Sequence, residues 1–324
     1  MTDDRRPAAG ISGLPFDDVR EVLRHFPEFD KSAASTARGR LAALGHMGEL
    51  AAWLVGWRGP DAALNRLQID MFISLLNVGQ DDVDDHQLHL MQDLLANVAG
   101  GGHSLSQVAM VHGAGLKVYD LALELPTGNI LETAAMDERE CAGAMAFGME
   151  GIAGGLDMVG VTRAGPGGNI GTGAILLLLF PDMEKLFLEG RDGQEAKLIR
   201  QAAERHGTGS RDPFDLLARL GSRDMAAMAG LIMSARTQSI PVVLAGLEAL
   251  AVVALLERAG AGNTGHCLAA HFGHGAEPEL VSHLGLQIVL RDDAGTIDGL
   301  PVAAALGMLR TAAAAAMPLL RNRE

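Results

Sequence analysis

A glycine-rich segment between two apolar runs has the clearest chemical meaning in this chain. Residues 157–180 read DMVGVTRAGPGGNIGTGAILLLLF, with glycines at positions 165, 167, 168 and 171. This order predicts a strand, a glycine-rich loop and the start of a buried helix. Glycine lets the backbone approach an anion closely, and the free N–H groups of a helix N-terminus favour negative charge. The segment therefore predicts a phosphate cradle, and an ordinary strand-to-helix turn is the alternative.

Three familiar motifs are absent from the sequence. A dinucleotide-binding fingerprint needs a third glycine where Ile170 stands, and a P-loop needs a Gly-Lys-Ser/Thr ending that this segment lacks. The chain also contains no Gly-x-Ser-x-Gly nucleophile elbow. The type of phosphate loop is therefore left open by these residues.

Two histidines and a glutamate have the spacing His-x-x-His-x-x-Glu, at His271, His274 and Glu277. These groups bind zinc, but a third ligand six residues on would face the wrong way on a single helix. Glycines at positions 273 and 275 and Pro278 predict a loop instead. The loop follows an apolar run at 266–271, and α/β sheets bind ligands where strands end. We therefore expect His271 and His274 to contact substrate, and we expect no metal site.

Two adjacent carboxylates, Asp292 and Asp293, come shortly before Gly295 and after another apparent strand. Such a pair has the chemistry of a general base, or it is a solvated turn. The residues alone favour the turn. The acidic run at 81–85, with His86 and His89, predicts a solvated face or a helix start rather than a metal site.

The elements that must position these residues change in character along the chain. Residues 1–60 carry apolar side chains at helical spacing, and residues 301–320 are alanine-rich and helical again. Between them, short apolar runs alternate with helical stretches, at 69–76, 116–123, 158–161, 240–247, 266–271 and 287–290. Continuous hydrophobicity is typical of strands that are buried on both faces.

The fold class predicted from this order is α/β. We expect a parallel-sheet, Rossmann-like core with helices on both faces, formed by residues 63–299. Residues 1–62 together with 300–324 are expected to form a small helical domain. A further helix carries Ala226, Gly230 and Ser234 at i, i+4 and i+8. This smooth face favours close helix packing within the core, with a subunit interface as the alternative.

Composition excludes several classes of protein. The 324 residues are 48% hydrophobic with a net charge of −14, and no basic run is present that could follow nucleic acid. The two cysteines, Cys141 and Cys267, form neither a disulfide framework nor a zinc ribbon. No signal peptide is visible. The longest apolar stretches are too short for a membrane span, or they are interrupted by charge at Glu248 and Arg310. These features predict a cytoplasmic protein that binds neither nucleic acid nor membrane.

Several segments, taken in order, resemble the nicotinate-nucleotide–dimethylbenzimidazole phosphoribosyltransferase family, which makes the lower-ligand nucleotide of cobalamin. The family patterns SLGRLEELA, GGAAINVLA and VVDVG resemble residues 43–51, 101–110 and 116–121. GTxN, AMT and GEMGIGNTT resemble residues 127–129, 135–137 and 163–171. DPLEVLAALGGFEIAAMAGAILAA, PVVLDGF and RLGEGTGA resemble residues 212–235, 241–247 and 291–298. Each piece is short, but the set is collinear over nearly the whole chain and is therefore specific.

The resemblance implies a parallel-sheet α/β domain with a small helical domain from the two termini, usually in a dimer. It also implies a reaction. A benzimidazole nitrogen attacks C1′ of nicotinate mononucleotide, a glutamate acts as base, and nicotinate leaves. The glycine-rich loop would hold the 5′-phosphate, and no cofactor is required.

Several acidic positions of the family pattern are not retained. The base glutamate of RLGEGTGA falls on Ala294, the glutamate of GEMGIGNTT on Ala164, and the aspartate of PVVLDGF on Ala245. The family segment AADHGV has no counterpart for its Asp-His, because residues 75–79 read LLNVG. The spacing near SHVSAEPGH differs as well, so either His271 or His274 is the counterpart histidine.

Together these observations predict a divergent phosphoribosyltransferase that transfers ribose 5-phosphate from nicotinate mononucleotide to a benzimidazole-like base. Because each lies within two residues of Ala294, Asp293 or Asp292 is expected to serve as the base. The alternative is a non-catalytic, nucleotide-binding paralogue that regulates or pairs with an active family member. We expect a homodimer, or a heterodimer with such a paralogue. The expected phosphate-binding residues are Gly165, Gly167, Gly168, Asn169 and Thr172, and the expected substrate-binding residues are His271, His274, Gly295 and Thr296.

Overall fold

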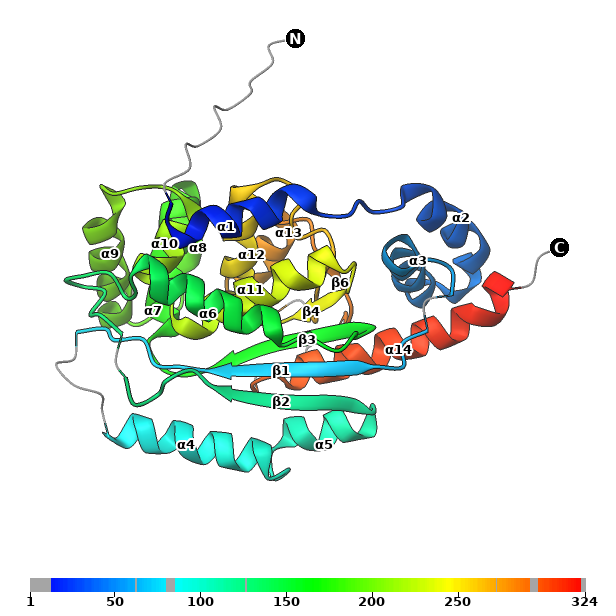
Figure 1. Ribbon diagram of the computed structural model, residues 1–324, viewed down its shortest axis with the longest axis horizontal. Coiled ribbons are helices and arrows are strands. Elements are labelled where there is room, and N and C mark those ends of the chain that lie inside the picture. Colours follow the sequence, from blue (N-terminus) through cyan, green and yellow to red (C-terminus); the bar gives the residue numbers. More distant parts are fainter. Residues whose placement is uncertain are drawn as a thin grey trace, which may run out of the picture.

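Six parallel strands form one sheet, as the sequence predicts, and Figure 1 shows β1 between β2 and β3. The order of the strands is β2-β1-β3-β4-β5-β6. The computed structural model describes residues 13–61, 63–79, 85–125, 127–271, 273–291 and 297–321. Every predicted strand overlaps an observed one. The strands are β1 (Leu67–Ile73), β2 (Ala114–Asp120), β3 (Met158–Ala164), β4 (Val242–Leu244), β5 (Cys267–Ala269) and β6 (Gln287–Ile288).

Burial explains why most of these strands lack alternating polarity. Every residue of β1, β4 and β5 is buried, as is every residue of β3 except Arg163. Only β2 alternates between exposed and partly buried residues, because it lies at the edge of the sheet and pairs with β1 alone. A strand covered on both faces has no solvent side on which polar residues would be favoured.

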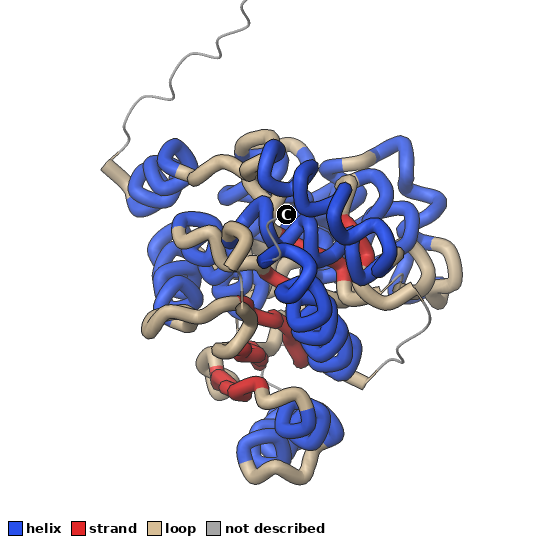
Figure 2. The backbone as a smooth tube through the Cα atoms, turned by 90° about the vertical axis from the view of Figure 1, so that its right-hand side faces the viewer, coloured by secondary structure: helices blue, strands red, loops and turns tan. Residues whose placement is uncertain are grey.

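Helices cover both faces of the sheet (Figure 2). On one face lie α4 (Asp85–Ala99), α5 (Ser104–Val111) and the N-terminal half of α14 (Leu300–Arg321). The other face carries the larger core. Its helices are α6 (Glu138–Glu150), α7 (Gly168–Leu179), α8 (Glu184–Leu188), α9 (Gly193–Gly207), α10 (Pro213–Leu220), α11 (Arg223–Thr237), α12 (Leu247–Ala259) and α13 (Glu277–His283).

The smooth face of α11 packs against α6 inside the chain, which confirms the core interpretation of that pattern. A Cβ atom at Gly230 would overlap the carbonyl of Met145, and one at Gly148 would overlap the carbonyl of Ala227. The two helix backbones can approach this closely only because Gly148 and Gly230 carry no side chain.

Both chain ends contribute helices beside the sheet. The N-terminal helices are α1 (Pro15–Val22), α2 (Lys31–Leu41) and α3 (His46–Arg58). The C-terminal half of α14 packs on α2 and α3, where Ala316 is buried beside Ala37 and Ala52. In contrast, α1 packs on α6, and its Phe16 ring lies 5.6 Å from that of Phe214 in α10. The division into domains 1–62 with 300–324, and 63–299, stays a prediction.

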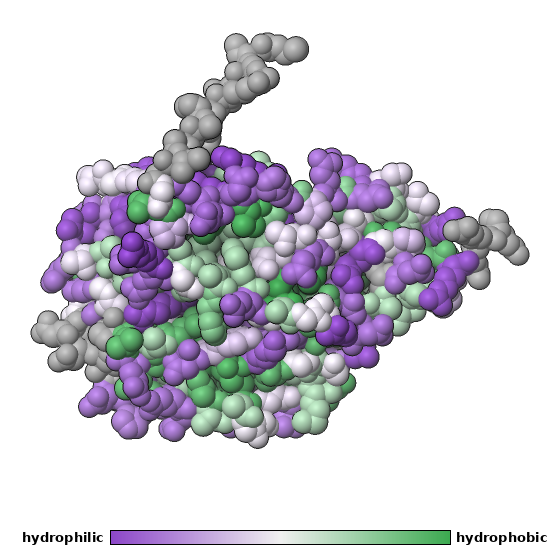
Figure 3. All heavy atoms as spheres, viewed as in Figure 1, coloured by the Kyte–Doolittle hydropathy of each residue, from purple (hydrophilic) through white to green (hydrophobic). Residues whose placement is uncertain are grey.

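One helix of the described chain, α14, is long and apolar enough to cross a membrane, although 56% of its apolar window is buried in the molecule. Such burial is typical of the core helix of a globular protein. At the surface, apolar side chains gather in a band between α6 and the α4–α5 pair, beside the edge strand β2 (Figure 3). Phe147 is 41% exposed and Leu125 is 62% exposed.

Candidate active site

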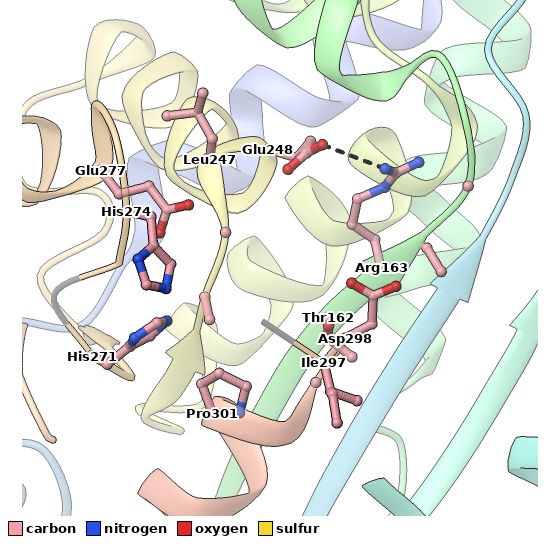
Figure 4. Close-up of a pocket in the computed structure, with 15 residues that line it drawn as sticks. Thr162, Arg163, Leu247, Glu248, His271, His274, Glu277, Ile297, Asp298 and Pro301 are labelled. Carbon is pink, nitrogen blue, oxygen red and sulfur yellow. Dashed lines mark hydrogen bonds and ion pairs between the residues drawn. The ribbon is translucent and has the colours of Figure 1, made fainter. Parts of the chain in front are cut away.

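A pocket of about 360 Å³ opens where β3, β4 and β5 end (Figure 4). This is the carboxyl edge of the sheet, where parallel α/β proteins bind ligands. Strand ends, the first turn of α12 and the start of α14 bring together residues that are distant in the sequence. The lining residues are Thr162, Arg163, Ala164, Gly165, Ala245, Gly246, Leu247, Glu248, His271, His274, Glu277, Ile297, Asp298, Gly299 and Pro301.

Arg163, near the end of β3, brings a positive charge to one wall of the pocket. Its Nε donates a hydrogen bond to Asp224 Oδ2 at 2.5 Å, and its Nη1 lies 3.5 Å from Glu248 Oε1. The Arg163 side chain is only 9% exposed. Burial alone lowers the pKa of Arg163, but the charges of Asp224 and Glu248 outweigh burial and raise it. Arg163 is therefore a permanent cation that two carboxylates hold in place.

The glycine-rich loop runs from β3 to α7 and packs on the chain that leaves β1. Gly165 and Gly167 have φ angles of +137° and +82°. A Cβ atom at Gly165 would overlap the carbonyl oxygen of Ser74, and one at Gly167 would overlap that of Leu76. Backbone hydrogen bonds from the amides of Ser74 and Leu76 to this segment continue the pairing of β1 with β3. The two glycines are therefore required by this close backbone packing, whatever the loop binds.

The guanidinium of Arg163 lies directly against this loop. A Cβ atom at Gly168, the first residue of α7, would lie 2.7 Å from Arg163 Nη1 and 3.0 Å from Nη2. Nη2 is buried and has no hydrogen-bond partner among the described residues. Gly165 lines the pocket, whereas Gly167 and Gly168 lie behind it in the loop. A helix N-terminus and an unpaired N–H group of a buried cation thus occur side by side.

The other two expected phosphate contacts have protein partners. Asn169 Nδ2 donates a hydrogen bond to Glu195 Oε1 in α9 at 2.7 Å. Thr172 is fully buried, and its hydroxyl points to Met225 Sδ at 3.6 Å. Neither side chain lines the pocket, so any contact that they make with a ligand phosphate would come from their backbone. The phosphate-binding role of this loop stays a prediction.

His271, His274 and Glu277 form the opposite wall of the pocket (Figure 4). His271 is 6% exposed, and its ring centroid lies 5.9 Å from that of His274. The loop turns at Gly273, whose φ is +78°, and a Cβ atom there would overlap the Glu277 side chain. Both histidines thus lie at the pocket where the sequence places them, in a loop that leads into α13 at Glu277.

Two carboxyl groups of the pocket, those of Glu277 and Asp298, have raised pKa values. Burial, with a contribution from the charge of Glu248, raises the pKa of Glu277 to about 7, although a hydrogen bond from the His274 backbone opposes this. Burial also raises the pKa of Asp298, and Glu248 adds to that effect while Arg163 opposes it. The pocket therefore holds one buried cation and three acidic side chains, two of which retain protons more readily than usual.

Part of the predicted site lies outside the described residues. Asp292 and Asp293, expected as the base, belong to that part, as do Ala294, Gly295 and Thr296. The residues that follow, Ile297 to Gly299, line the pocket. The roles expected for residues 292–296 stay predictions.

Four charged residues of the pocket were missed as site residues by the sequence reasoning: Arg163, Glu248, Glu277 and Asp298. Two of them carried a usable signal. Arg163 is the only charged residue in the strand MVGVTRA, and Glu248 follows shortly after a buried apolar strand. Glu277 was considered only as the third member of a metal-binding pattern. Within the described part of the chain, no group of three His, Cys, Asp or Glu side chains could hold a metal ion.

The arrangement has two chemical capacities. Three carboxylates around one cavity favour a positively charged organic group or a transition state that develops positive charge. A carboxyl group with a pKa near 7 can also accept a proton at neutral pH. Beside them, Arg163 and the N-terminus of α7 offer N–H donors to an anion. The pocket is thus suited to a ligand with a cationic and an anionic part.

Comparison with known proteins agrees with these features. The family model described as phosphoribosyltransferase matches residues 31–320. The nicotinate-nucleotide–dimethylbenzimidazole phosphoribosyltransferase of Sinorhizobium fredii is 38% identical over 318 residues, covering 94% of each chain. A relative of the same name from Rhizobium leguminosarum bv. trifolii is 37% identical over 321 residues, again covering 94% of each.

The fold is shared with a solved structure. The nicotinate-nucleotide–dimethylbenzimidazole phosphoribosyltransferase of Thermus thermophilus matches with a TM-score of 0.76 at 22% identity, covering 90% of this chain and 96% of that one. With the family model, the curated relatives and the fold in agreement, the chain belongs to the nicotinate-nucleotide–dimethylbenzimidazole phosphoribosyltransferase family.

Proposed function

We propose that this protein transfers the 5-phosphoribosyl group of nicotinate mononucleotide to a benzimidazole-like base, giving an α-ribazole phosphate-type product for cobalamin synthesis. The single observation that carries the proposal is the pocket, in which three carboxylates face a buried arginine beside a glycine-rich loop. Relatives that align with 94% of this chain are named nicotinate-nucleotide–dimethylbenzimidazole phosphoribosyltransferase.

The charges of the pocket match the two ends of this substrate. The pyridinium ring of nicotinate mononucleotide is positively charged, and positive charge develops at C1′ as the ring departs. Glu248, Glu277 and Asp298 stabilise that charge. The 5′-phosphate binds at the loop that begins at Gly165, where the N-terminus of α7 and the unpaired Nη2 of Arg163 donate hydrogen bonds.

The reaction exchanges one C–N bond for another. The lone pair of an acceptor nitrogen forms the new bond to C1′. The bond from C1′ to the pyridinium nitrogen breaks, and its electron pair stays on nicotinate as the neutral pyridine nitrogen. His271 and His274 contact the bound rings from the opposite wall, while Gly295 and Thr296 remain expected contacts from the sequence.

Alanine occupies several positions where the family pattern has an acidic residue, but the pocket still contains acidic groups. Ala164 and Ala245 both line it, and Glu248 is only three residues beyond Ala245 at the same strand end. Glu277 and Asp298 add two further carboxyl groups. The pocket thus retains the kind of charge that the reaction needs, from different positions.

The test is release of nicotinate by purified protein supplied with nicotinate mononucleotide and 5,6-dimethylbenzimidazole, followed by chromatography. We expect release that depends on the added base, together with a new ribotide product. A panel of other bases identifies the preferred acceptor. No release with any base would contradict the proposal. If nicotinate mononucleotide still raised the melting temperature in that case, the non-catalytic nucleotide-binding alternative would be favoured.

A homodimer, which the resemblance to the family implies, and a cytoplasmic location, which the composition of the sequence predicts, are part of the same proposal. Sedimentation velocity at micromolar concentration tests the dimer. A heterodimer with a paralogue would instead leave this chain monomeric when it is purified alone.

A further inference from the structure

Glu277 lies in the pocket, and no lysine or arginine in the described part of the chain forms an ion pair with it. It begins α13, and its side chain packs against Gly273, whose lack of a side chain leaves room for it. In Figure 4 the carboxyl group points into the cavity from the wall opposite Arg163. The side chains of Arg163 and Asp298 lie across the pocket, so a ligand in this cavity lies between the two walls.

The groups around Glu277 leave it free to take up a proton. The charge that acts on it most strongly is that of Glu248, from the first turn of α12, and this charge is repulsive. A backbone N–H of His274 is its hydrogen-bond donor. Among the described residues, the other titratable or charged side chains that line the same cavity are His271, His274, Arg163 and Asp298.

Glu248 and Asp298 are less suited to proton transfer. Glu248 Oε1 lies 3.5 Å from Nη1 of Arg163, so this carboxylate already has a cationic partner. Burial raises the pKa of Asp298, and the charge of Arg163 opposes that effect. Both groups lie near Arg163, on the wall where the phosphoribosyl end is proposed to bind.

We propose that Glu277 is the general base of the transfer, a role that the family assigns to the position occupied here by Ala294. This inference rests on the proposed function. As the acceptor nitrogen bonds to C1′, the N–H proton on the other nitrogen of its ring passes to the Glu277 carboxylate. The electron pair of that N–H bond stays in the ring, and nicotinate leaves with the pair of the broken C–N bond. Proton and charge are thereby balanced without any further reactant.

A pH profile provides a readout that a merely structural role would not produce. Only the ionised carboxylate accepts a proton, and burial and Glu248 raise the pKa of Glu277 to about 7. The value of kcat/KM should therefore be constant above this pH and fall tenfold per pH unit below it.

The experiment compares Glu277→Gln with Glu279→Gln, a residue of the same helix that does not line the pocket. Nicotinate release is measured from pH 5.5 to 9 for wild type and for each variant. Loss of a general base lowers kcat by about 10²- to 10⁴-fold. We expect this loss for Glu277→Gln with little change in KM for nicotinate mononucleotide, and no acidic limb in its remaining activity. Glu279→Gln should match wild type.

Two further variants keep the outcome decisive. Glu277→Asp retains a carboxylate, so it should keep an acidic limb even if Glu277→Gln folds poorly. Asp293→Asn tests the base expected from the sequence. The proposal is overturned if Glu277→Gln keeps the wild-type rate or pH profile, or if Asp293→Asn alone removes the acidic limb. In either case base-dependent release by wild type would leave the proposed function intact. No release by wild type would overturn both.

Discussion

Arg163 is the side chain on which the electrostatics of the pocket depend. It is buried beside Asp224, and the Asp224 carboxylate also accepts hydrogen bonds from Ser222 Oγ and the Met225 amide. The two charges of a buried ion pair stabilise each other, because either charge alone would lie in a medium that solvates it poorly. Removing one partner is therefore far more costly than removing both.

We predict that Arg163→Met lowers the free energy of unfolding by about 3–5 kcal/mol. Urea denaturation measures this change, and isothermal titration calorimetry should show weaker binding of nicotinate mononucleotide. The matched control is Arg38→Met, because the Arg38–Glu49 pair is 54% and 46% exposed. An exposed pair of this kind contributes at most about 1 kcal/mol. The double variant Arg163→Met/Asp224→Asn should be more stable than Arg163→Met, and equal stability would contradict the compensation argument.

At the scale of elements, two helices must approach closely for the larger core to form. Helix α6 meets α11 at Gly148 and Gly230, where backbone contacts backbone. Gly143 belongs to the same helix, but it is exposed and a Cβ atom there would meet nothing within 4 Å. In this helix, Gly148 is thus required by packing, whereas the main effect of Gly143 is to lower the helix propensity of the segment.

Replacing each of these two glycines by alanine should change the free energy of unfolding in opposite directions. Gly148→Ala places a methyl group on the Ala227 carbonyl and should destabilise the protein by about 1–3 kcal/mol. Gly143→Ala should stabilise it by about 0.5–1 kcal/mol through helix propensity. The urea midpoints of the two variants, compared with that of wild type, test this prediction. An unchanged midpoint for Gly148→Ala would contradict it, because it would mean that the two helices can move apart without loss of stability.

At the scale of the whole molecule, α14 joins two layers. Its first half packs on the sheet, where Val302 and Leu306 contact the position of Gly160 in β3. Its second half buries Ala316 against α2 and α3. Because the pocket is lined by Pro301 from the first turn of the same helix, α14 connects the terminal helices to the site.

If the terminal helices form a separate unit, they should open without the sheet. Ala316→Asp buries an unpaired charge between α14, α2 and α3, whereas Ala314→Asp places the same charge on an exposed turn. Hydrogen exchange should then accelerate at least about tenfold in residues 31–58, while β1 and β3 keep their protection. The Ala314→Asp variant should exchange like wild type. Equal acceleration in the sheet would show that helices and sheet unfold together and would contradict the predicted division.

The local pattern of residues was sufficient to predict the layers of the fold. Short, largely apolar runs of strand length predicted all six strands. For β1, β3, β4 and β5 the run reflects burial on both faces, whereas the edge strand β2 alternates in exposure. The helical spacing of residues 1–60 does not locate the break at which the structure ends α2 at Leu41 and restarts the helix at His46, after Gly45 at a φ of +57°. A helix break of this kind depends on how α2 packs back on α3, and periodicity does not report that packing.

Local residue patterns were sufficient to predict the strands, the parallel sheet, the family resemblance and the placement of His271 and His274 at a strand end. Those features follow from neighbouring residues and from collinear motifs. The contacts between charged side chains could be read only from the folded chain. Asp224 and Glu248 lie 61 and 85 residues beyond Arg163 along the chain, yet the three form one ion-pair network. Glu277 reaches the same pocket from a fourth segment. Charge interactions depend on distance in space, which sequence spacing does not encode.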